Sequence, residues 1–248
     1  MKRYLQTLIK IVSFILFIFA WNYIAFVVDN KFLFPSVWDI LKALNDIFRE
    51  DIFFPVVLRT LKKLVMAIFF SGILAIAVGV ISYRNRLIQT LLLPYISFIK
   101  SVPTVALIIL VLIWAKAEVV PVIVATMILF PILYDSILSG IESIDRDIIR
   151  MSQVFKVKKT RVLREVYIPG VYFHIAGGIH SLIGLGFKVI IAGEVLSQEN
   201  LTIGGEILLN KTYLESSKIF AWVIVVILIN FFIEQGILMF NRKINSWR

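Results

Sequence analysis

The sequence predicts an all-α integral membrane protein with six transmembrane helices. Of its 248 residues, 60% are hydrophobic, compared with about 45–50% apolar residues in a typical soluble domain, and the mean hydropathy is +0.92. Apolar runs recur at lengths near the roughly 20 residues that a helix needs to cross a bilayer. The basic residues cluster in short loops between these runs, which is the pattern of cytoplasmic loops in membrane proteins.

The first apolar run, 11–28, follows Lys2, Arg3 and Lys10. A basic flank followed by an apolar run also occurs in signal peptides. This run is long, however, and no cleavage site of small residues follows it. We therefore expect a first transmembrane helix whose N-terminus lies in the cytoplasm.

The next segment, "FPSVWDILKALNDIFRE", predicts an amphipathic helix in the outer interface of the membrane. Pro35-Ser36 is a typical helix start. The apolar residues that follow share one helical face: Val37, Ile40, Leu41, Leu44, Ile47 and Phe48. We expect 1–58 to form a unit of one transmembrane helix and this external helix, ahead of a core of five spans over 59–248.

The second, fifth and sixth spans are expected at 64–82, 170–196 and 218–240. The second and fifth are rich in Gly, Ala and Ser, which allow helices in lipid to approach closely. The polar segment 197–217 is expected outside the membrane.

The third and fourth spans contain prolines. The apolar run 87–115 is longer than one span needs and is interrupted by Pro94 and Pro103. We expect an interfacial or broken helix in its first half, followed by a third span over 102–115. The fourth span is expected at 119–138.

Positive charge predicts the orientation. Seven Lys and Arg residues lie in the loop 146–164, which outweighs any other segment and is therefore placed in the cytoplasm. Both termini of this multi-pass membrane protein are then expected in the cytoplasm. Arg59, Lys62 and Lys63 fall at the opposite end of the second span, and we expect their long side chains to snorkel to the membrane surface.

Composition also excludes several function classes. The formal net charge of +10 resides in loops between apolar spans, so nucleic acid is not an expected partner. The chain has no cysteine, which excludes a thiol nucleophile and a Cys-ligated metal. His174 and His180 are six residues apart and do not share a helical face. We expect no metal and no cofactor.

The basic loop itself reads "RDIIRMSQVFKVKKTRVLREVYIPG". Its spacing predicts a short helix, a turn near 157–159, and a second helix that leads into the fifth span. Ile148, Met151, Ser152 and Phe155 lie on one stripe of the first helix. An apolar stripe in a cytoplasmic loop suggests a helix that docks into a soluble partner. The alternative is a solvated loop whose cations only set the topology.

Five segments together carry a family resemblance. They read "LFPSVWDILKAL" (33–44), "RTLKKLVMAIFFSGILAIAVGVISYRNR" (59–86), "SVPTVALIILVLIW" (101–114), "GIESIDRDIIRMSQVFKVKKTRVLREVYIPG" (140–170) and "AGGIHSLIGLGFKVIIAGEVL" (176–196). In order and spacing they resemble the inner-membrane permease subunit of ATP-binding-cassette (ABC) importers. The branch they resemble imports nitrate, sulfonates, taurine, bicarbonate and related small molecules.

The resemblance implies a type I ABC importer permease fold in the bacterial plasma (inner) membrane, with a coupling loop over 140–168. The implied partners are two copies of an ABC ATPase subunit, an extracytoplasmic solute-binding protein, a second permease copy in a homodimer, and membrane lipid. No phosphate-binding G-x-x-x-x-G-K-[ST] motif occurs. ATP hydrolysis is therefore expected in the separate subunit, and this chain is not expected to be an enzyme.

The residues of the coupling loop differ from the motif that is usual in the family. Where the family has Glu-Ala-Ala and then Gly, this chain has Arg150, Met151, Ser152 and Lys156. The lost Gly would have loosened the end of the helix. The residues implied to dock into the ATPase are Ile148, Ile149, Arg150, Met151, Ser152, Phe155 and Lys156.

Four residues are candidates for the translocation pathway: Lys188, Glu194, Pro103 and Gly184. A charge inside a membrane span is a functional hypothesis by default, and Lys188 would suit an anionic substrate, although it could instead snorkel or pair with another helix. Glu194 could act as a gate or pair with a cation. Gly184 could equally be a packing position. Asp135 and Glu142 are expected to partner cations of the basic loop.

The expected function is therefore the permease subunit of an ABC importer for a small, often anionic solute such as nitrate, a sulfonate or taurine. A vitamin or vitamin-precursor importer and a non-transport membrane scaffold are the alternatives. Subunits that energise vitamin importers rely on Ala-Arg-Gly coupling helices, and no such tripeptide occurs here. A lipid-modifying enzyme would need clustered polar catalytic groups, which the sequence does not offer.

Overall fold

The computed structural model describes residues 2–245, and these residues form helices and connecting loops without a strand. The helices are α1 (Lys2–Val28), α2 (Val37–Arg49), α3 (Phe53–Arg84), α4 (Arg86–Ser101), α5 (Thr104–Leu112), α6 (Val120–Glu142), α7 (Arg146–Val154), α8 (Lys159–Val162), a π-helical turn (Leu163–Tyr167), α9 (Ile168–Leu196), α10 (Ile203–Thr212) and α11 (Ser216–Asn245). The all-α membrane fold is confirmed.

Five stretches are long and apolar enough to span a bilayer, and they match five of the six expected spans. They are Leu5–Val28, Phe53–Arg84, Val120–Glu142, Lys159–Leu196 and Ser216–Met239. α3 begins at Phe53, so the expected boundary of the core at residue 59 lies inside this helix.

The expected third span differs from the structure. α5 has nine residues, a length of about 14 Å, which is too short to cross a ~30 Å hydrocarbon core alone. It meets α4 at an angle of 98°, so the two helices form either one broken span or a re-entrant pair. The break lies at Val102, which is extended with ψ 129°, because a residue before proline avoids the helical region.

The ion pair of Lys100 with Asp135 ties α4 to α6. The expectation that Asp135 partners a cation of the basic loop is therefore wrong, because α4 brings a lysine closer. Glu142 accepts a hydrogen bond from Gln89 Nε2 at 3.5 Å, which likewise belongs to α4.

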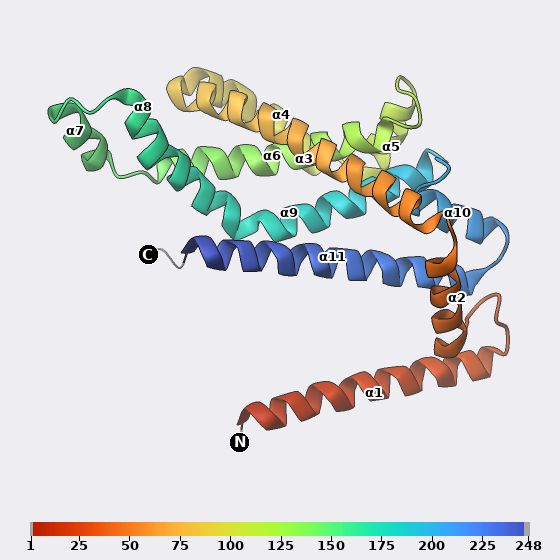
Figure 1. Cartoon of the computed structure of the whole chain (residues 1–248). Helices are drawn as coiled ribbons and strands as arrows, with labels where there is room; N and C mark the ends of the chain where they lie inside the picture. Colours follow the sequence, from red (N-terminus) through yellow and green to blue (C-terminus); the bar gives the residue numbers. More distant parts are fainter. Residues whose placement is uncertain (1, 246–248) are drawn as a thin grey trace.

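Helices α3, α6 and α9 pack along one another and form the centre of the bundle (Figure 1). Glycines mark their closest approaches. A Cβ added at Gly193 of α9 would lie 2.8 Å from Pro121 Cα of α6, and one added at Gly140 would lie 2.8 Å from Val171 Cα. Both distances are too short for a real side chain, so the small residues allow these helices to touch.

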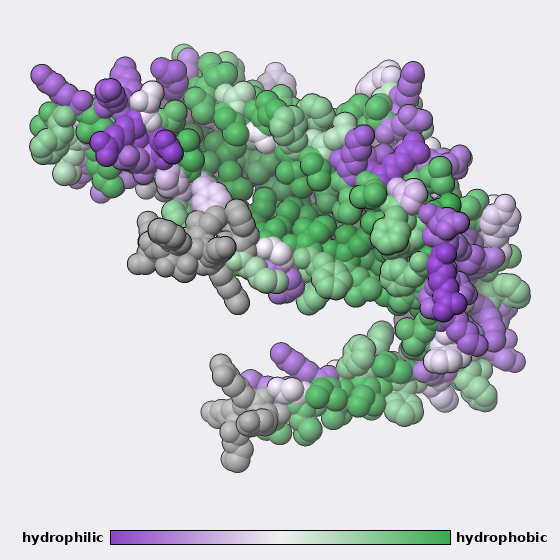
Figure 2. All heavy atoms as spheres, viewed as in Figure 1, coloured by the Kyte–Doolittle hydropathy of each residue, from purple (hydrophilic) through white to green (hydrophobic). Residues whose placement is uncertain are grey.

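The N-terminal helix α1 stands apart from the bundle. Figure 2 shows open space between it and the rest of the molecule over most of its length, and none of its most apolar stretch is buried. It is held near its far end, where Trp21 packs on Phe34 and Phe220. Trp21 Nε1 also donates a hydrogen bond to the Pro35 carbonyl at 3.0 Å.

Helix α2 lies across the ends of the long helices (Figure 1), and the predicted amphipathic helix is confirmed. Ser36 caps it: its hydroxyl accepts from Asp39 N at 3.2 Å and donates to the Asp39 carboxylate at 2.7 Å. Ile40 and Ile47 are buried beneath it.

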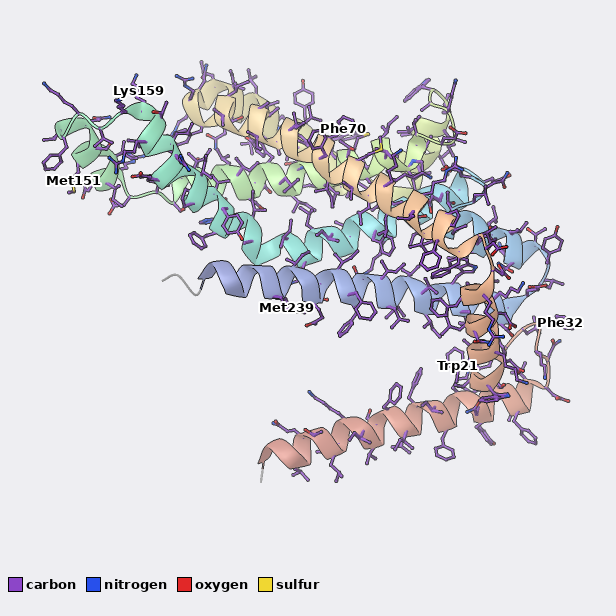
Figure 3. All side chains as sticks on the ribbon, in the orientation of Figure 1. Trp21, Phe32, Phe70, Met151, Lys159 and Met239 are labelled. Carbon is purple, nitrogen blue, oxygen red and sulfur yellow. The ribbon has the colours of Figure 1, made fainter. Side chains whose placement is uncertain are left out.

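Polar residues gather at the two ends of the bundle, with an apolar girdle between them (Figure 2). One end carries α2 and α10; we call it the α10 end. The other carries α7 and α8, together with the start of α1 and the end of α11 (Figure 1); we call it the α7 end. Met151 and Lys159 lie at the α7 end, and Trp21 and Phe32 at the α10 end (Figure 3). α10 itself was not predicted, because 197–217 reads only as polar.

Candidate functional site

The predicted short helix of the basic loop is α7, and it projects from the α7 end of the bundle (Figure 1). None of its residues is buried. It begins at Asp145, whose carboxylate accepts from Asp147 N at 2.8 Å. Arg150 pairs with Asp147 at 3.1 Å on the same helix. Capping by Asp145 and the Arg150–Asp147 pair therefore stabilise the helix from within its own segment.

The exposed apolar face of α7 is not quite the predicted stripe. Ile148, Met151 and Phe155 are exposed, and Phe155 reaches 74%. Ser152 instead is half-covered, like Ile149, and donates to the Ile149 carbonyl at 2.7 Å. Val154, which the sequence did not single out, takes its place with 78% exposure. A face of this kind can fill an apolar groove on another protein.

Lys156 retains the backbone turn that the family's Gly would make. Its φ is +50°, a left-handed conformation that costs a non-glycine residue about 1–2 kcal/mol. Lys156 N donates to the Gln153 carbonyl at 3.0 Å and Val157 N to that of Ser152 at 2.9 Å. This pair of bonds is a Schellman motif. The turn therefore forms with Lys at position 156, although a lysine in place of glycine suggests that it would not.

The second half of the loop feeds α9 without an interruption. α8 and the π-helical turn Leu163–Tyr167 lead directly into α9, although Pro169 lies in the first turn of α9. Ile168 N donates to the Leu163 carbonyl, five residues back. This wider turn accommodates a proline that lacks an N–H and crowds the preceding turn.

Among the pathway candidates, Lys188 lies exposed on α9. No hydrogen bond or ion pair joins it to any residue between 2 and 245 that the structure places. The same face of α9 exposes Gly177, Gly178 and Ser181. Leu185, between Ser181 and Lys188, is also exposed, so these residues form an uncovered stripe along α9 in which Lys188 is the charged member.

The other candidates have packing or structural positions in this chain. Gly184 faces Asn230 of α11, whose side-chain oxygen would lie 3.5 Å from an added Cβ. Pro103 occupies the N-cap of α5 at the bend. His174 Nδ1 lies 3.3 Å from the Gly170 carbonyl, and no cluster of potential metal ligands occurs among the described residues.

Glu194 is fully buried in a network of charges that the sequence did not predict. Its carboxylate accepts from Thr60 Oγ1 at 3.0 Å, from Lys63 Nζ at 3.1 Å and from Gly204 N at 3.0 Å. A buried carboxylate is stable only when it is paired and hydrogen-bonded in this way.

Glu199 completes the network. It pairs with Lys63 and, at 3.5 Å, with Arg59. We call Arg59, Thr60, Lys63, Glu194 and Glu199 the charged core. It joins α3, the end of α9 and the loop that leads into α10.

The charged core corrects the expectation for the cations of the second span. Lys63 is only 7% exposed and points inward, rather than snorkelling to the membrane surface. The sequence held one signal for this: Arg59 and Lys63 are four residues apart and share a helical face. Nothing local, however, shows that two carboxylates more than 130 residues away lie opposite that face.

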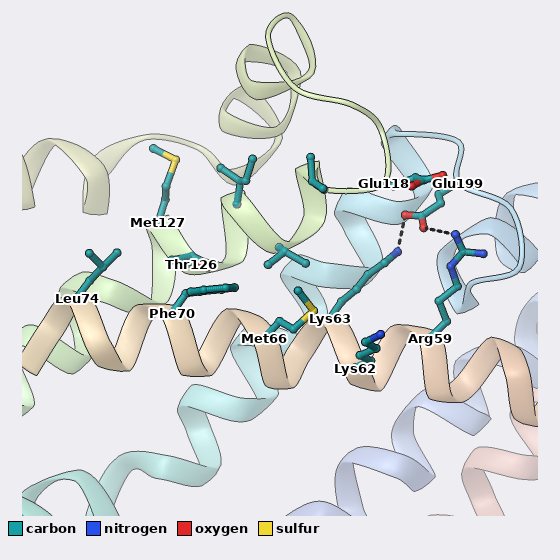
Figure 4. A pocket seen from close by; sticks show the side chains of 13 residues that line it. Arg59, Lys62, Lys63, Met66, Phe70, Leu74, Glu118, Thr126, Met127 and Glu199 are labelled. Atoms are coloured by element: carbon teal, nitrogen blue, oxygen red, sulfur yellow. Dashed lines mark hydrogen bonds and ion pairs between the residues drawn. The ribbon is translucent and has the colours of Figure 1, made fainter.

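A groove of about 680 Å³ opens beside the charged core, between α3 and α6. Figure 4 shows Arg59, Lys62 and Lys63 at one end of it, and Met66, Phe70 and Leu74 along the α3 wall. Glu118 lies at the same end as the cations. The groove thus combines a charged mouth with an apolar floor.

Comparison with known proteins agrees with this arrangement. Residues 67–246 match the family described as the binding-protein-dependent transport system inner membrane component. The chain is 24% identical to the taurine transport system permease protein TauC of Escherichia coli, over 76% of this chain and 68% of that protein. It is 24% identical to the bicarbonate transport system permease protein CmpB of Synechococcus elongatus, over 59% and 53% of the two chains. A crystal structure of an amino acid ABC transporter with histidines superposes with a TM-score of 0.62 at 15% identity, over 77% of this chain and 94% of that one.

Proposed function

Because this chain belongs to the family of binding-protein-dependent transport system inner membrane components, we propose that it forms the translocation pathway of an ATP-driven importer for a small, often anionic solute. It is a multi-pass membrane protein and the permease subunit of an ABC importer. The proposed solutes are taurine, other sulfonates, nitrate and bicarbonate. The named relatives carry taurine and bicarbonate in their titles.

The observation that carries the coupling proposal is the exposed apolar face of α7. Ile148, Met151, Val154 and Phe155 are water-exposed in the isolated chain, yet α7 is well formed and capped at both ends. A preformed amphipathic helix loses little conformational freedom on docking. We propose that it inserts into a groove of a separate ATPase, with Arg150 and Lys156 at the rim of the interface.

Alternating access then follows from the connection between the loop and the bundle. α8 and the π-helical turn are continuous with α9, so movement of α7 is transmitted directly to the span that carries Lys188 and Glu194. Two ATPase copies that close on ATP would draw two such loops together and turn the cavity outward. ATP is hydrolysed in those subunits and not in this chain.

A second copy of the chain is the proposed partner within the membrane. The uncovered stripe with Gly177, Gly178, Ser181 and Lys188 faces no other helix of the described chain. Its small residues would let a helix of another chain approach closely. In a homodimer two such stripes would border a common pathway. Lys188 would then provide a cation for an anionic solute at a depth where an unpaired charge is otherwise costly.

The orientation follows from the same assignment. The α7 end carries the basic loop, the start of α1 and the end of α11 (Figure 1), so ATPases at this end would make both termini cytoplasmic. The α10 end, with α2 and α10, then receives the solute-binding protein outside the membrane.

Co-purification with the candidate ATPase tests the coupling proposal. We expect Met151→Ala and Phe155→Ala to reduce ATPase retention and ATP-driven uptake of radiolabelled taurine into proteoliposomes by about tenfold, as for truncated aromatic anchors of an interface. Phe232→Ala is the matched control, because Phe232 is 68% exposed on α11, away from the loop. Full retention and uptake in both loop variants would show that α7 is not the docking helix.

Lys188→Met tests the pathway proposal separately. We expect the Michaelis constant for taurine, methanesulfonate or nitrate uptake to rise while ATPase retention stays normal. Unchanged affinity and rate for every one of these anions would remove Lys188 from the pathway.

A further inference from the structure

We propose that the groove between α3 and α6 binds one phospholipid with a zwitterionic phosphoethanolamine headgroup, as a structural ligand of the permease. The α3 wall of the groove is one helical stripe at four-residue spacing: Lys62, Met66, Phe70 and Leu74. Residues at this spacing stack along one face of a helix. The stripe therefore begins with a cation and continues with three apolar side chains.

The dimensions of the stripe match one leaflet of a bilayer. Lys62 and Leu74 are twelve residues apart in a continuous helix, which is a rise of about 18 Å. Half of a ~30 Å hydrocarbon core is about 15 Å. A lipid with its phosphate at Lys62 would place an acyl chain over Met66 and Phe70 and end it near Leu74.

The α6 wall continues the apolar floor. Val122, Ile123 and Met127 line it opposite the α3 stripe. On α3, Met66, Phe70 and Leu74 are 39%, 46% and 48% exposed, so the described chain leaves a large part of each side chain open to the groove. The groove opens within the apolar girdle of the bundle, and this part of the surface would face the lipid of the bilayer.

The charges at the mouth fit a zwitterionic headgroup. Lys62 has no ion pair or hydrogen bond to a described residue, and Arg59 makes only the 3.5 Å contact with Glu199 while remaining 42% exposed in its side chain. Both can donate to a phosphate. Glu118 lines the same mouth (Figure 4), and it can accept from the ammonium group of an ethanolamine. A purely anionic headgroup would meet that carboxylate unpaired.

A bound lipid would contact the charged core directly, because Arg59, Lys63 and Glu199 belong to the charged core and also line the groove. The phosphate would fix the position of Arg59, which otherwise makes only its 3.5 Å contact with Glu199. The rest of the lipid would fill the groove between α3 and α6. The lipid would thus stabilise the α10 end of the bundle, where α3, α9 and α10 meet.

Native mass spectrometry of the purified protein from nanodiscs of phosphatidylethanolamine and phosphatidylglycerol tests the proposal. We expect one retained phosphatidylethanolamine per copy, and a loss of about fivefold in retention for Lys62→Gln. Lys42→Gln, which removes an exposed cation of α2 outside the groove, should retain the lipid normally. Glu118→Gln should shift the retained lipid toward phosphatidylglycerol. Absence of a retained lipid, or equal losses in Lys62→Gln and Lys42→Gln, would overturn the proposal.

A single introduced cysteine identifies the occupant, because the natural chain has none. We expect a bimane label at Met66→Cys to be quenched by phosphatidylethanolamine with brominated tails, and to keep that quenching longer than a label at Val65→Cys when unbrominated lipid is added. Val65 lies at the same depth and is 65% exposed outside the groove. Equal exchange at both sites, quenching by aqueous iodide, or a disulfide between two copies of the unlabelled Met66→Cys variant would each contradict a bound lipid. The last two results would assign the groove to water or to a second copy.

Discussion

The charged core and the coupling loop both contain paired charges, but burial gives these pairs opposite roles. In the charged core, the Lys63 side chain is 9% exposed and that of Glu194 is completely buried. In the coupling loop, the side chains of Arg150 and Asp147 are 75% and 74% exposed. The charged core joins segments that are distant in the sequence, whereas the loop pairs join residues of one helix.

The difference shows that the contribution of an ion pair to stability can be judged only from how deeply the pair is buried. Exposed pairs are weakened by solvent and salt and contribute about 0–1 kcal/mol. A buried pair gains little over an apolar substitute, but removal of one partner leaves an uncompensated charge. The charged core therefore specifies one arrangement of α3, α9 and α10, and the loop charges leave α7 free to bind a partner.

The largest expected effect is that of Glu194→Ala. It would leave Lys63, Thr60 and Gly204 N without their shared acceptor, and we expect a loss of about 3–5 kcal/mol in the free energy of unfolding. The measurement is denaturant unfolding in detergent micelles, followed by tryptophan fluorescence. Asp147→Ala in the loop is the matched control. A similar denaturant midpoint for the two variants would show that buried and exposed pairs do not differ in their contribution to stability.

A double variant sharpens this test. Replacing Lys63 by Met and Glu194 by Leu together removes both charges and leaves Glu199 paired with Arg59. We expect this double variant to lose less stability than the sum of the losses in Lys63→Met and Glu194→Leu, because no unpaired charge remains between the two positions. A loss equal to that sum would show that the two residues do not interact.

Lys156→Gly has an intermediate expected effect. Glycine adopts the left-handed conformation at +50° without steric cost, so we expect the end of α7 to become more stable by about 1 kcal/mol. The measurement is hydrogen exchange of the amides of Lys156 and Val157, which close the Schellman turn. Lys156→Ala is the control, because it removes the charge and keeps the steric cost. Faster exchange in Lys156→Gly would contradict this account of the turn.

The smallest expected effect concerns pH at the α10 end. Burial, and then the neighbouring charge of Glu50, raise the pKa of Glu206 above its ordinary value. A raised pKa stabilises the fold below the unfolded-state pKa, and this stabilisation is lost as pH rises through the folded-state pKa. We expect Glu206→Gln to flatten the decline of the melting temperature as pH rises from mildly acidic values.

Asp39 provides the opposite sign at the same end. A hydrogen bond from Ser36 is the main cause that holds the pKa of Asp39 below its ordinary value, so its contribution is lost as pH falls through that lowered value. Asp39→Asn should therefore reduce the loss of stability in acid and leave the slope near neutral pH unchanged. Equal slopes in both variants and the natural protein would show that neither carboxylate contributes to the pH dependence.

Local patterns were sufficient for most helices. The membrane spans at α1, α3, α6, α9 and α11 follow from apolar length, because each long apolar helix must be shielded from water by lipid or by other helices. α2 follows from its Pro35-Ser36 start and its apolar face, and α7 from its apolar stripe. α10 was missed because "IGGEILLNKT" has two glycines in its first turn and no strong periodicity.

The sequence by itself determined the membrane class, five of the six spans, the amphipathic helices and the place of the basic loop, because these depend on periodicity and charge within short windows. Only the tertiary structure decided the 98° angle between α4 and α5 and the pairing of Lys63 with Glu194 and Glu199. Those features depend on which groups distant segments bring together. The free energy of a buried charge is set by its spatial neighbours, and a linear sequence does not list them.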